Sequence, residues 1–246
     1  MPGLSVLTVC SMNICRSPAA EVLLSRSLSC AIPAASVSVS SAGCVEAAGQ
    51  GAPRCDLAQA FIGVIEPEGR SRPISRQLVG DADLILAADC GHVARVVALR
   101  PESRERTFTL LEAARLASWV VGDEGVMELA RQKADGQELD CAPDDLRYLV
   151  EPLPNAEVPA ERLRWLLAEM NAARGIAPRR DHQFNHLLVE SLEPEDLPDP
   201  HILGMGLHEP VMAAMRRAVD EFTAAVSLVT DPIAKDAAVS GAGDDD

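Results

Sequence analysis

The feature that most constrains this chain is a polar loop near its N-terminus, residues 10–18, which carries two cysteines and an arginine. An apolar, β-branched run at residues 6–9 precedes the loop, and apolar residues recur at helical spacing across residues 20–28. Ser17 suits the N-cap of that helix, and Pro18 suits its first position, where a missing N–H costs nothing. In a strand–loop–helix unit, the N–H groups of the loop and of the helix N-terminus point at one spot and bind an anion there. The sequence therefore predicts an anion-binding loop after the first strand.

Cys10 opens this loop in surroundings that favour the thiolate over the thiol, because Arg16, the helix end and the loop N–H groups all stabilise negative charge. Arg16 can also close over the loop and hold two phosphate oxygens with its planar guanidinium. A nucleophile beneath a bound phosphoryl group indicates transfer through a phospho-cysteine intermediate. An isolated C-x5-R would more simply be a structural cysteine beside a surface arginine, but the flanking strand and helix argue against that interpretation.

The stretch from Val9 to Pro18 resembles the phosphate loop of the low-molecular-weight protein tyrosine phosphatases, whose usual form is V-C-x-G-N-I-C-R-S-P. The resemblance implies that Cys10 is the nucleophile and that Arg16 clamps the phosphate. It implies that the following loop residues bind the phosphate: Ser11, Met12, Asn13, Ile14, Cys15, Arg16 and Ser17. Isoleucine at position 14 favours the tyrosine-directed branch, since the phosphoarginine-directed branch carries threonine there.

The same resemblance assigns supporting roles around the loop. Asn13 would hold the loop shape, and Ser41, in a Ser-Ala-Gly turn, would hydrogen-bond to it. Ser17 would donate to the thiolate and ease its departure. Cys15 would be the redox partner of Cys10, forming a protective disulfide with it on oxidation.

Four departures from the family pattern bear on specificity and activity. Met12 stands where the family usually has glycine, and methionine would cost roughly 1–2 kcal/mol if that position needs a positive φ. Gly69 replaces the histidine of the family's H-R-S-R-P-L-T segment, His201 replaces a tyrosine, and residues 45–49 lack the aromatic that walls the substrate slot. These departures leave open a catalytically weak module that binds phosphate or regulates a partner.

Departure of the alcohol requires a proton donor, and general acid catalysis of this kind gives about 10²–10⁴-fold. The family supplies the proton from an aspartate in a D-P-Y loop near its C-terminus. Asp199, followed by Pro200 and His201, occupies that place, so we expect Asp199 to be the general acid. Asp196 and the pair Asp231-Pro232 are rivals by composition.

The remaining pattern predicts an α/β fold. Short apolar runs at 36–41, 83–89 and 106–110 alternate with helical patterns at 54–64 and 92–99, the first with Leu57, Ala60 and Phe61 facing inward. This alternation predicts a single open, twisted, four-stranded parallel sheet flanked by helices, with the phosphate loop after the first strand. Ligands of such sheets lie at the carboxyl ends of the strands, where Cys10 falls.

We expect one phosphatase core domain from residues 1–118 and 191–230, interrupted by a helical insertion at 119–190. The insertion has helical patterns near residue 123, at 159–174 and after residue 181, and it is a candidate surface for a protein partner. A long amphipathic helix at 209–229 should cover one face of the sheet. The small, acidic tail at 231–246 is expected to be disordered.

Composition excludes several classes. A net charge of −15 among 246 residues argues against nucleic acid and against attraction to anionic membranes. No apolar run is long enough for a membrane span, and the N-terminus lacks signal-peptide features. The seven cysteines include no CxxC pair, which fits a reducing cytoplasm, and the alanine- and arginine-rich usage suggests a bacterium.

No metal or cofactor is expected. His182 and His186 have the i, i+4 spacing that can share a metal, but no third ligand accompanies them. The expected substrate is a phosphorylated protein or a small aryl phosphate. A thiol-dependent arsenate reductase is the alternative enzyme, because Cys90 follows the third predicted strand. That chemistry passes electrons through further thiols, and no second cysteine follows Cys90 within one short helix.

Overall fold

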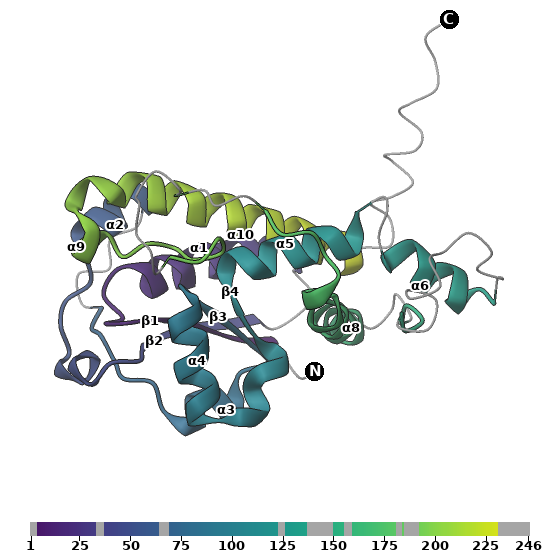
Figure 1. The fold of residues 1–246 in the computed structure, drawn as a ribbon, viewed down its shortest axis with the longest axis horizontal. Helices are drawn as coiled ribbons and strands as arrows, with labels where there is room; N and C mark the ends of the chain where they lie inside the picture. Colours follow the sequence, from purple (N-terminus) through teal and green to yellow (C-terminus); the bar gives the residue numbers. More distant parts are fainter. Residues whose placement is uncertain are drawn as a thin grey trace, which may run out of the picture.

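The structure, a computed structural model, describes residues 4–32, 37–63, 69–122, 126–136, 150–154, 159–180, 184 and 192–230. Its centre is one sheet of four parallel strands in the order β2-β1-β3-β4 (Figure 1). The strands are β1 (Leu4–Cys10), β2 (Val37–Gly43), β3 (Leu84–Ala87) and β4 (Thr107–Thr109). The predicted four-stranded parallel sheet is therefore confirmed.

Helices connect these strands and flank the sheet. The α-helices are α1 (Arg16–Ala31), α2 (Asp56–Ile62), α3 (Arg76–Asp81), α4 (Cys90–Leu99), α5 (Leu110–Val121), α6 (Val126–Ala134), α8 (Pro159–Ala172), α9 (Pro200–Leu203) and α10 (His208–Thr230). The 3₁₀-helices are η1 (Glu46–Gln50), η2 (Pro101–Arg106), η3 (Ala173–Gly175) and η5 (Met205–Leu207). None of the helices in this described part of the chain is both long and apolar enough to cross a membrane.

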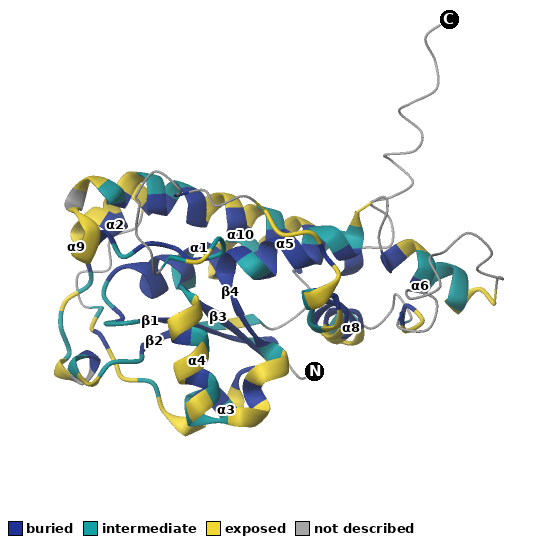
Figure 2. Ribbon diagram, in the orientation of Figure 1, coloured by how far each residue is buried: buried dark blue, intermediate teal, exposed yellow. Residues whose placement is uncertain are grey.

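Alternating strand residues build two apolar layers, as the period of a β-strand requires. On one face Val6, Leu86 and Phe108 pack in a cluster with α1, α5 and α10. On the other face Leu7 and Ile85 pack with α3 and α4. Figure 1 shows these helices above and below the sheet, and in Figure 2 the strands between them are mainly dark blue, the colour of buried residues.

The strand order places the anion loop at a switch point of the sheet. The chain runs from β1 to β2 on one side and then returns to β3 on the other side of β1. Crossovers from this point diverge and leave a crevice at the carboxyl end of β1, where ligands of open α/β sheets bind. Cys10 is the last residue of β1 and pairs with Gly43.

The amphipathic stripes predicted for two long helices are confirmed. The α10 stripe is buried along its length: Met212, Met215, Val219, Phe222, Val226 and Val229. The α8 stripe is buried in the same cluster: Leu163, Leu166, Leu167 and Met170. The inward face predicted for α2 was wrong, because Leu57 and Phe61 are about two-fifths exposed whereas Ala58 and Ile62 are buried. The periodicity of this seven-residue helix was too short to fix its rotation.

Helices α6 and α8 are the described helices of the predicted insertion 119–190. Because α8 packs in the main apolar cluster with α5 and α10, this segment is continuous with the core. Its division from the core stays a prediction. The helix predicted after residue 181, with His182 and His186, and the tail 231–246 lie outside the described residues, although Phe184 is described and buried.

Candidate active site

The loop after β1 is held from outside by main-chain hydrogen bonds. Three of its carbonyl groups accept N–H donors from the β2–α2 connection: Cys10 from Cys44 (2.9 Å), Ser11 from Val45 (3.1 Å) and Ile14 from Cys55 (2.9 Å). Gly43 permits this close approach, since a β-carbon there would lie 2.8 Å from Ser11 O and from Met12 C. Real β-carbons are not found that close to a backbone, so the end of β2 must be a glycine.

At Asn13 the backbone of the loop adopts a left-handed conformation, which reverses the direction of the chain. Asn13 has a φ of +56° and is the one non-glycine residue of the described chain with a positive φ. Asparagine tolerates the left-handed region better than most residues, because its short side chain can hydrogen-bond locally. Met12 does not occupy that region, so the strain considered for methionine at this position does not arise.

The hydrogen bonds of the Asn13 side chain fix the orientation of its amide. Arg72 N–H donates to Asn13 Oδ1 at 3.0 Å, so Nδ2 faces Ser17 Oγ at 3.0 Å and Ser41 Oγ at 2.7 Å. Ser17 Oγ accepts from Asn13, so its own hydrogen can be donated to Cys10 Sγ, 3.0 Å away, which is nearer than its other acceptor, the Ala42 carbonyl at 3.4 Å. The Asn13 N–H donates to the same sulfur at 3.3 Å. Two oriented donors therefore face the Cys10 sulfur.

The same network continues behind the loop. Ser41 accepts from Asn13 and donates to Glu21 Oε2, which also pairs with Arg54 Nη2 at 3.0 Å. Arg54 fills the space beside Gly69, where a β-carbon would lie 2.6 Å from Arg54 Cδ. The glycine at position 69 is therefore matched by an arginine that occupies the volume a larger residue would need.

Arg16 is buried beside the loop, with its guanidinium in a cage of oxygen acceptors. Its Nη1 donates to Asp89 Oδ2 at 3.1 Å and to the Leu197 carbonyl at 2.8 Å. Its Nη2 donates to Asp199 Oδ2 at 2.5 Å. Burial alone would lower the pKa of Arg16, but the negative charges of Cys10, Asp199 and Asp89 outweigh it, so the pKa is raised. The arginine therefore stays cationic and is held in one orientation.

The two candidate aspartates before α9 differ in their surroundings. Asp199 begins α9, accepts from the His201 N–H at 3.0 Å, and reaches Arg16 with its other oxygen. Asp196 is buried, and its oxygens accept from the N–H groups of Cys90 at 2.7 Å and Glu193 at 3.1 Å. Asp196 therefore anchors its segment to the start of α4, whereas Asp199 lies at the guanidinium. Asp231 lies outside the described residues.

Sequence reasoning missed Asp89 and His92. Asp89 caps α4 by accepting from His92 N–H at 2.9 Å, and His92 Nδ1 lies 2.8 Å from Asp89 Oδ1. His92 Nε2 is hydrogen-bonded to Ser11 Oγ at 2.9 Å. Burial would raise the pKa of Asp89, but His92 and Arg16 outweigh it and lower the pKa. One signal in the sequence could have identified Asp89: it closely follows the apolar run of β3, and so lies at the carboxyl edge of the sheet where ligands bind.

A depression beside Arg16 is lined by three acids, Asp89, Asp196 and Asp199, and by apolar residues. Ile202 and Leu203 of α9 lie on its wall and are 77% and 38% exposed. His201, which stands where the family usually has a tyrosine, packs edge-on against His208, with ring centroids 4.8 Å apart. The part of the wall that α9 contributes is therefore aliphatic.

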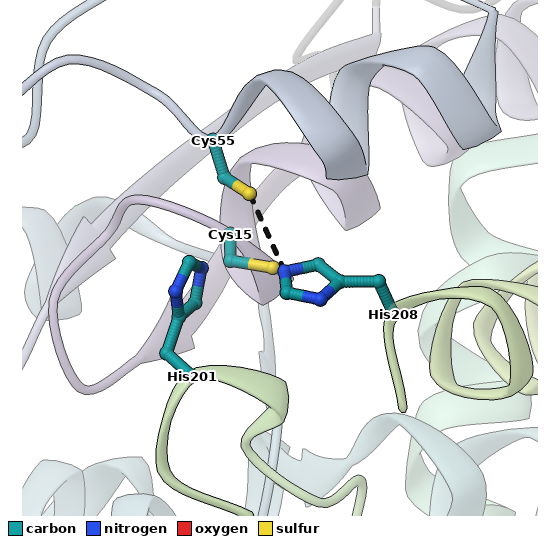
Figure 3. Close-up of side chains that lie close together, drawn as sticks. All are labelled: Cys15, Cys55, His201 and His208. Atoms are coloured by element: carbon teal, nitrogen blue, oxygen red, sulfur yellow. Dashed lines mark hydrogen bonds between the residues drawn. The ribbon is translucent and has the colours of Figure 1, made fainter. Parts of the chain in front are cut away.

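One group of possible metal ligands adjoins the loop in the described part of the chain: Cys15, Cys55, His201 and His208 (Figure 3). Cys15 is buried, and this burial raises the pKa of its thiol well above the usual range. The nearby Cys55 and Cys10 raise the pKa further. A disulfide between Cys15 and Cys10 stays a prediction, because both are free thiols here.

Comparison with known proteins gives consistent matches. Residues 5–123 match the family model described as low molecular weight phosphotyrosine protein phosphatase. The low molecular weight protein-tyrosine-phosphatase Wzb of Escherichia coli (strain K12) is 38% identical over 105 residues, which are 42% of this chain and 67% of the relative. The probable low molecular weight protein-tyrosine-phosphatase EpsP of Ralstonia nicotianae is 36% identical over 109 residues, 44% of this chain and 71% of the relative.

Among solved structures, a protein tyrosine phosphatase from Entamoeba histolytica with Hepes in its active site matches with a TM-score of 0.50 and 14% identity. The match covers 89% of this chain and 94% of that one, and it shows a shared fold. The family-model match ends before Asp199.

Proposed function

This chain belongs to the low molecular weight protein-tyrosine-phosphatase family of enzymes, and we propose that it hydrolyses phosphomonoesters, most directly protein phosphotyrosine, through a phospho-cysteine on Cys10. The observation that carries the proposal is the Cys10 sulfur facing two oriented donors, from Ser17 and Asn13, beside the buried guanidinium of Arg16. Such an arrangement stabilises a thiolate and attracts a phosphoryl group to it.

In the first step the Cys10 thiolate attacks phosphorus, and the bond between phosphorus and the leaving oxygen breaks. In the free enzyme Arg16 Nη2 donates to Asp199, and on binding the phosphate replaces Asp199 as the acceptor. Asp89 and the Leu197 carbonyl continue to accept from Nη1. Once the phosphate displaces Asp199 from the guanidinium, the carboxylate takes up a proton from solvent, and Asp199 then gives that proton to the leaving oxygen.

In the second step water attacks the phospho-cysteine and the phosphorus–sulfur bond breaks. Asp199, now a carboxylate, takes the proton from the water. The Ser17 hydroxyl, with its hydrogen directed at Cys10 Sγ, stabilises the departing thiolate. Inorganic phosphate leaves, and the enzyme returns to its starting protonation state.

The depression beside Arg16 favours an aryl ester. Ile202 and Leu203 offer exposed aliphatic surface on its wall, and a phenyl ring buries apolar area there at about 25 cal/mol per Å². Residues 45–49 contain no aromatic, so aliphatic contacts with this wall bind the substrate ring in place of aromatic stacking. The acids Asp89 and Asp199 beside it disfavour substrates with acidic groups next to the phosphate.

Two alternatives are less well supported. An arsenate reductase passes electrons through a second thiolate, but partial burial and the adjacent Asp196 raise the pKa of Cys90 to about 11. Such a thiol is a poor nucleophile at neutral pH. A catalytically weak module was suggested by four departures from the family pattern: Met12, Gly69, His201 and the missing aromatic at 45–49. Two of them are accommodated locally, because Met12 has no positive φ and Arg54 fills the space beside Gly69.

The test is hydrolysis of p-nitrophenyl phosphate by the full chain and three variants. We expect Cys10→Ser to be inactive and Asp199→Asn to lose about 10²–10⁴-fold in kcat. Asp196→Asn is the matched control, because it changes a neighbouring carboxylate that holds the segment. It should change thermal stability more than the chemical step.

Equal activity of wild type and Cys10→Ser would refute the nucleophile, and a larger kcat loss in Asp196→Asn than in Asp199→Asn would refute the acid. A panel of tyrosine, serine and arginine phosphopeptides then tests the substrate class. Tight vanadate binding without hydrolysis of any member would support the binding module, and arsenate-dependent oxidation of a thiol donor, lost in Cys90→Ser, would support the reductase.

A further inference from the structure

We propose that Cys15, Cys55, His201 and His208 form a Zn²⁺ site beside the phosphate loop (Figure 3). Each residue offers one ligand atom, and all four atoms lie within 4.8 Å of one another. The ligands come from four separate places: the end of the phosphate loop, the residue before α2, helix α9 and the first residue of α10.

The spacing of the ligand atoms fits a tetrahedral zinc ion. With Zn–S near 2.3 Å and Zn–N near 2.0–2.1 Å, tetrahedral geometry places a sulfur and a nitrogen about 3.6 Å apart. Cys55 Sγ and His208 Nε2 are 3.5 Å apart, as drawn in Figure 3. The other pairs, which lie within 4.8 Å, need to close by about 1.5 Å at most. His201, on the exposed four-residue helix α9, is the ligand best able to make that movement.

The chemistry of the donors selects the metal. Two thiolates and two neutral imidazoles balance the charge of a divalent ion, which matters because Cys15, Cys55 and His208 are buried. Within the described residues the group contains no carboxylate, and magnesium and calcium prefer oxygen ligands. A Cys₂His₂ set with closed coordination is typical of structural zinc.

The position of the site suggests what a bound ion does. Cys15 directly precedes Arg16, and the Cys55 N–H donates to Ile14 O at 2.9 Å, so two ligands belong to the phosphate loop and its support. His201 lies two residues after Asp199, so a third ligand belongs to the segment of the proposed acid. A bound zinc therefore ties the two halves of the proposed active site together. It also occupies Cys15 and prevents a disulfide with Cys10.

No sequence motif predicts this site, because the intervals between its ligands match none of the zinc patterns and the chain has no CxxC. His201, which departs from the family's tyrosine, and His208 meet only after folding. The site therefore revises the expectation that the chain holds no metal.

The experiment titrates the full chain, stripped with a chelator, with Zn²⁺ and with Co²⁺ as a spectroscopic probe. We expect one ion per chain by elemental analysis, an intense tetrahedral Co²⁺ spectrum with a thiolate-to-metal band, and a raised thermal midpoint. Cys55→Ser should lose the thiolate band in part, and His208→Gln and His201→Gln should weaken binding. His201→Gln lies on the surface, so folding is not at issue for that variant.

Two control variants locate the ion. Cys30→Ser removes an exposed thiol of α1, and Cys10→Ser removes the proposed nucleophile; both should keep the full spectrum. Absence of stoichiometric binding, or binding unchanged in both Cys55→Ser and His201→Gln, would overturn the site. Loss of binding in Cys10→Ser would do so too, since it would place the metal at the active-site thiol. Hydrolysis by the metal-free protein is measured separately, so failure of the zinc site does not bear on the phosphatase proposal.

Discussion

Replacing Asn13 separates two properties of the phosphate loop, its left-handed backbone and its hydrogen bonds. Asn13→Ala removes three side-chain hydrogen bonds, two of them buried, to Arg72, Ser17 and Ser41. At about 1 kcal/mol net for each bond, this costs about 3 kcal/mol. Alanine at a φ of +56° adds about 1 kcal/mol, so the free energy of unfolding should fall by about 4 kcal/mol.

Asn13→Gly is the matched variant, because it loses the same three hydrogen bonds without the strain of a β-carbon at positive φ. Glycine also has more freedom in the unfolded chain, so the net gain over alanine should be about 0.5–1 kcal/mol. Both variants lose the amide that directs the Ser17 hydrogen to Cys10. We therefore expect them to lose catalytic activity to a similar extent despite their different stabilities.

Urea unfolding followed by circular dichroism gives the stabilities, and p-nitrophenyl phosphate hydrolysis gives kcat/KM. Ser29→Ala, which alters an exposed hydroxyl of α1, should stay within about 0.5 kcal/mol of wild type. An alanine variant as stable as the glycine variant would refute the left-handed backbone. Wild-type activity in both variants would refute the orienting role of the amide.

Three further predictions follow from the site. Met12→Gly should not gain the 1–2 kcal/mol of relieved strain, because Met12 has no positive φ; urea unfolding measures this, and a gain of that size would contradict the loop geometry. Ile202→Ala should raise KM for an aryl phosphate more than for an alkyl phosphate, and equal effects on the two KM values would refute the contact between Ile202 and the aryl group. Asp89→Asn should raise KM by loosening Arg16. It should also reduce the fall in the free energy of unfolding as the pH is lowered. The folded pKa of Asp89 is below its unfolded value of about 3.9, so its contribution is complete above that value and is lost as pH falls through the folded pKa. A variant with the wild-type fall in this free energy, measured by urea unfolding against pH, would oppose this assignment.

The sequence was sufficient to predict the strand–loop–helix unit around Cys10 and the sheet, because both depend on local pattern. The β-branched run ending at Cys10 and the helix starting by Ser17 define a strand–loop–helix unit without any long-range information. The stripes of α8 and α10 were equally clear, since each spans several helical turns.

Contacts between distant segments were not predictable from one sequence. Asp89 and Arg16 are 73 residues apart, and their pairing depends on the β1–β3 register. The aliphatic wall was missed because Ile202 reads as an ordinary residue of a loop. The edge-on contact of His201 with His208 was not predicted either. The positions of Ile202 and His201 depend on how the short helix α9 is rotated, which composition and periodicity do not determine.

The most direct test of the account is to quench the enzyme in acid during turnover of an aryl phosphate and to locate any phosphoryl group by peptide mass spectrometry. The account predicts one phosphoryl group on the peptide that contains Cys10, attached through sulfur, and none when Cys10→Ser protein is treated identically. Steady hydrolysis by the wild type with no such adduct, or with the phosphoryl group on another residue, would contradict it.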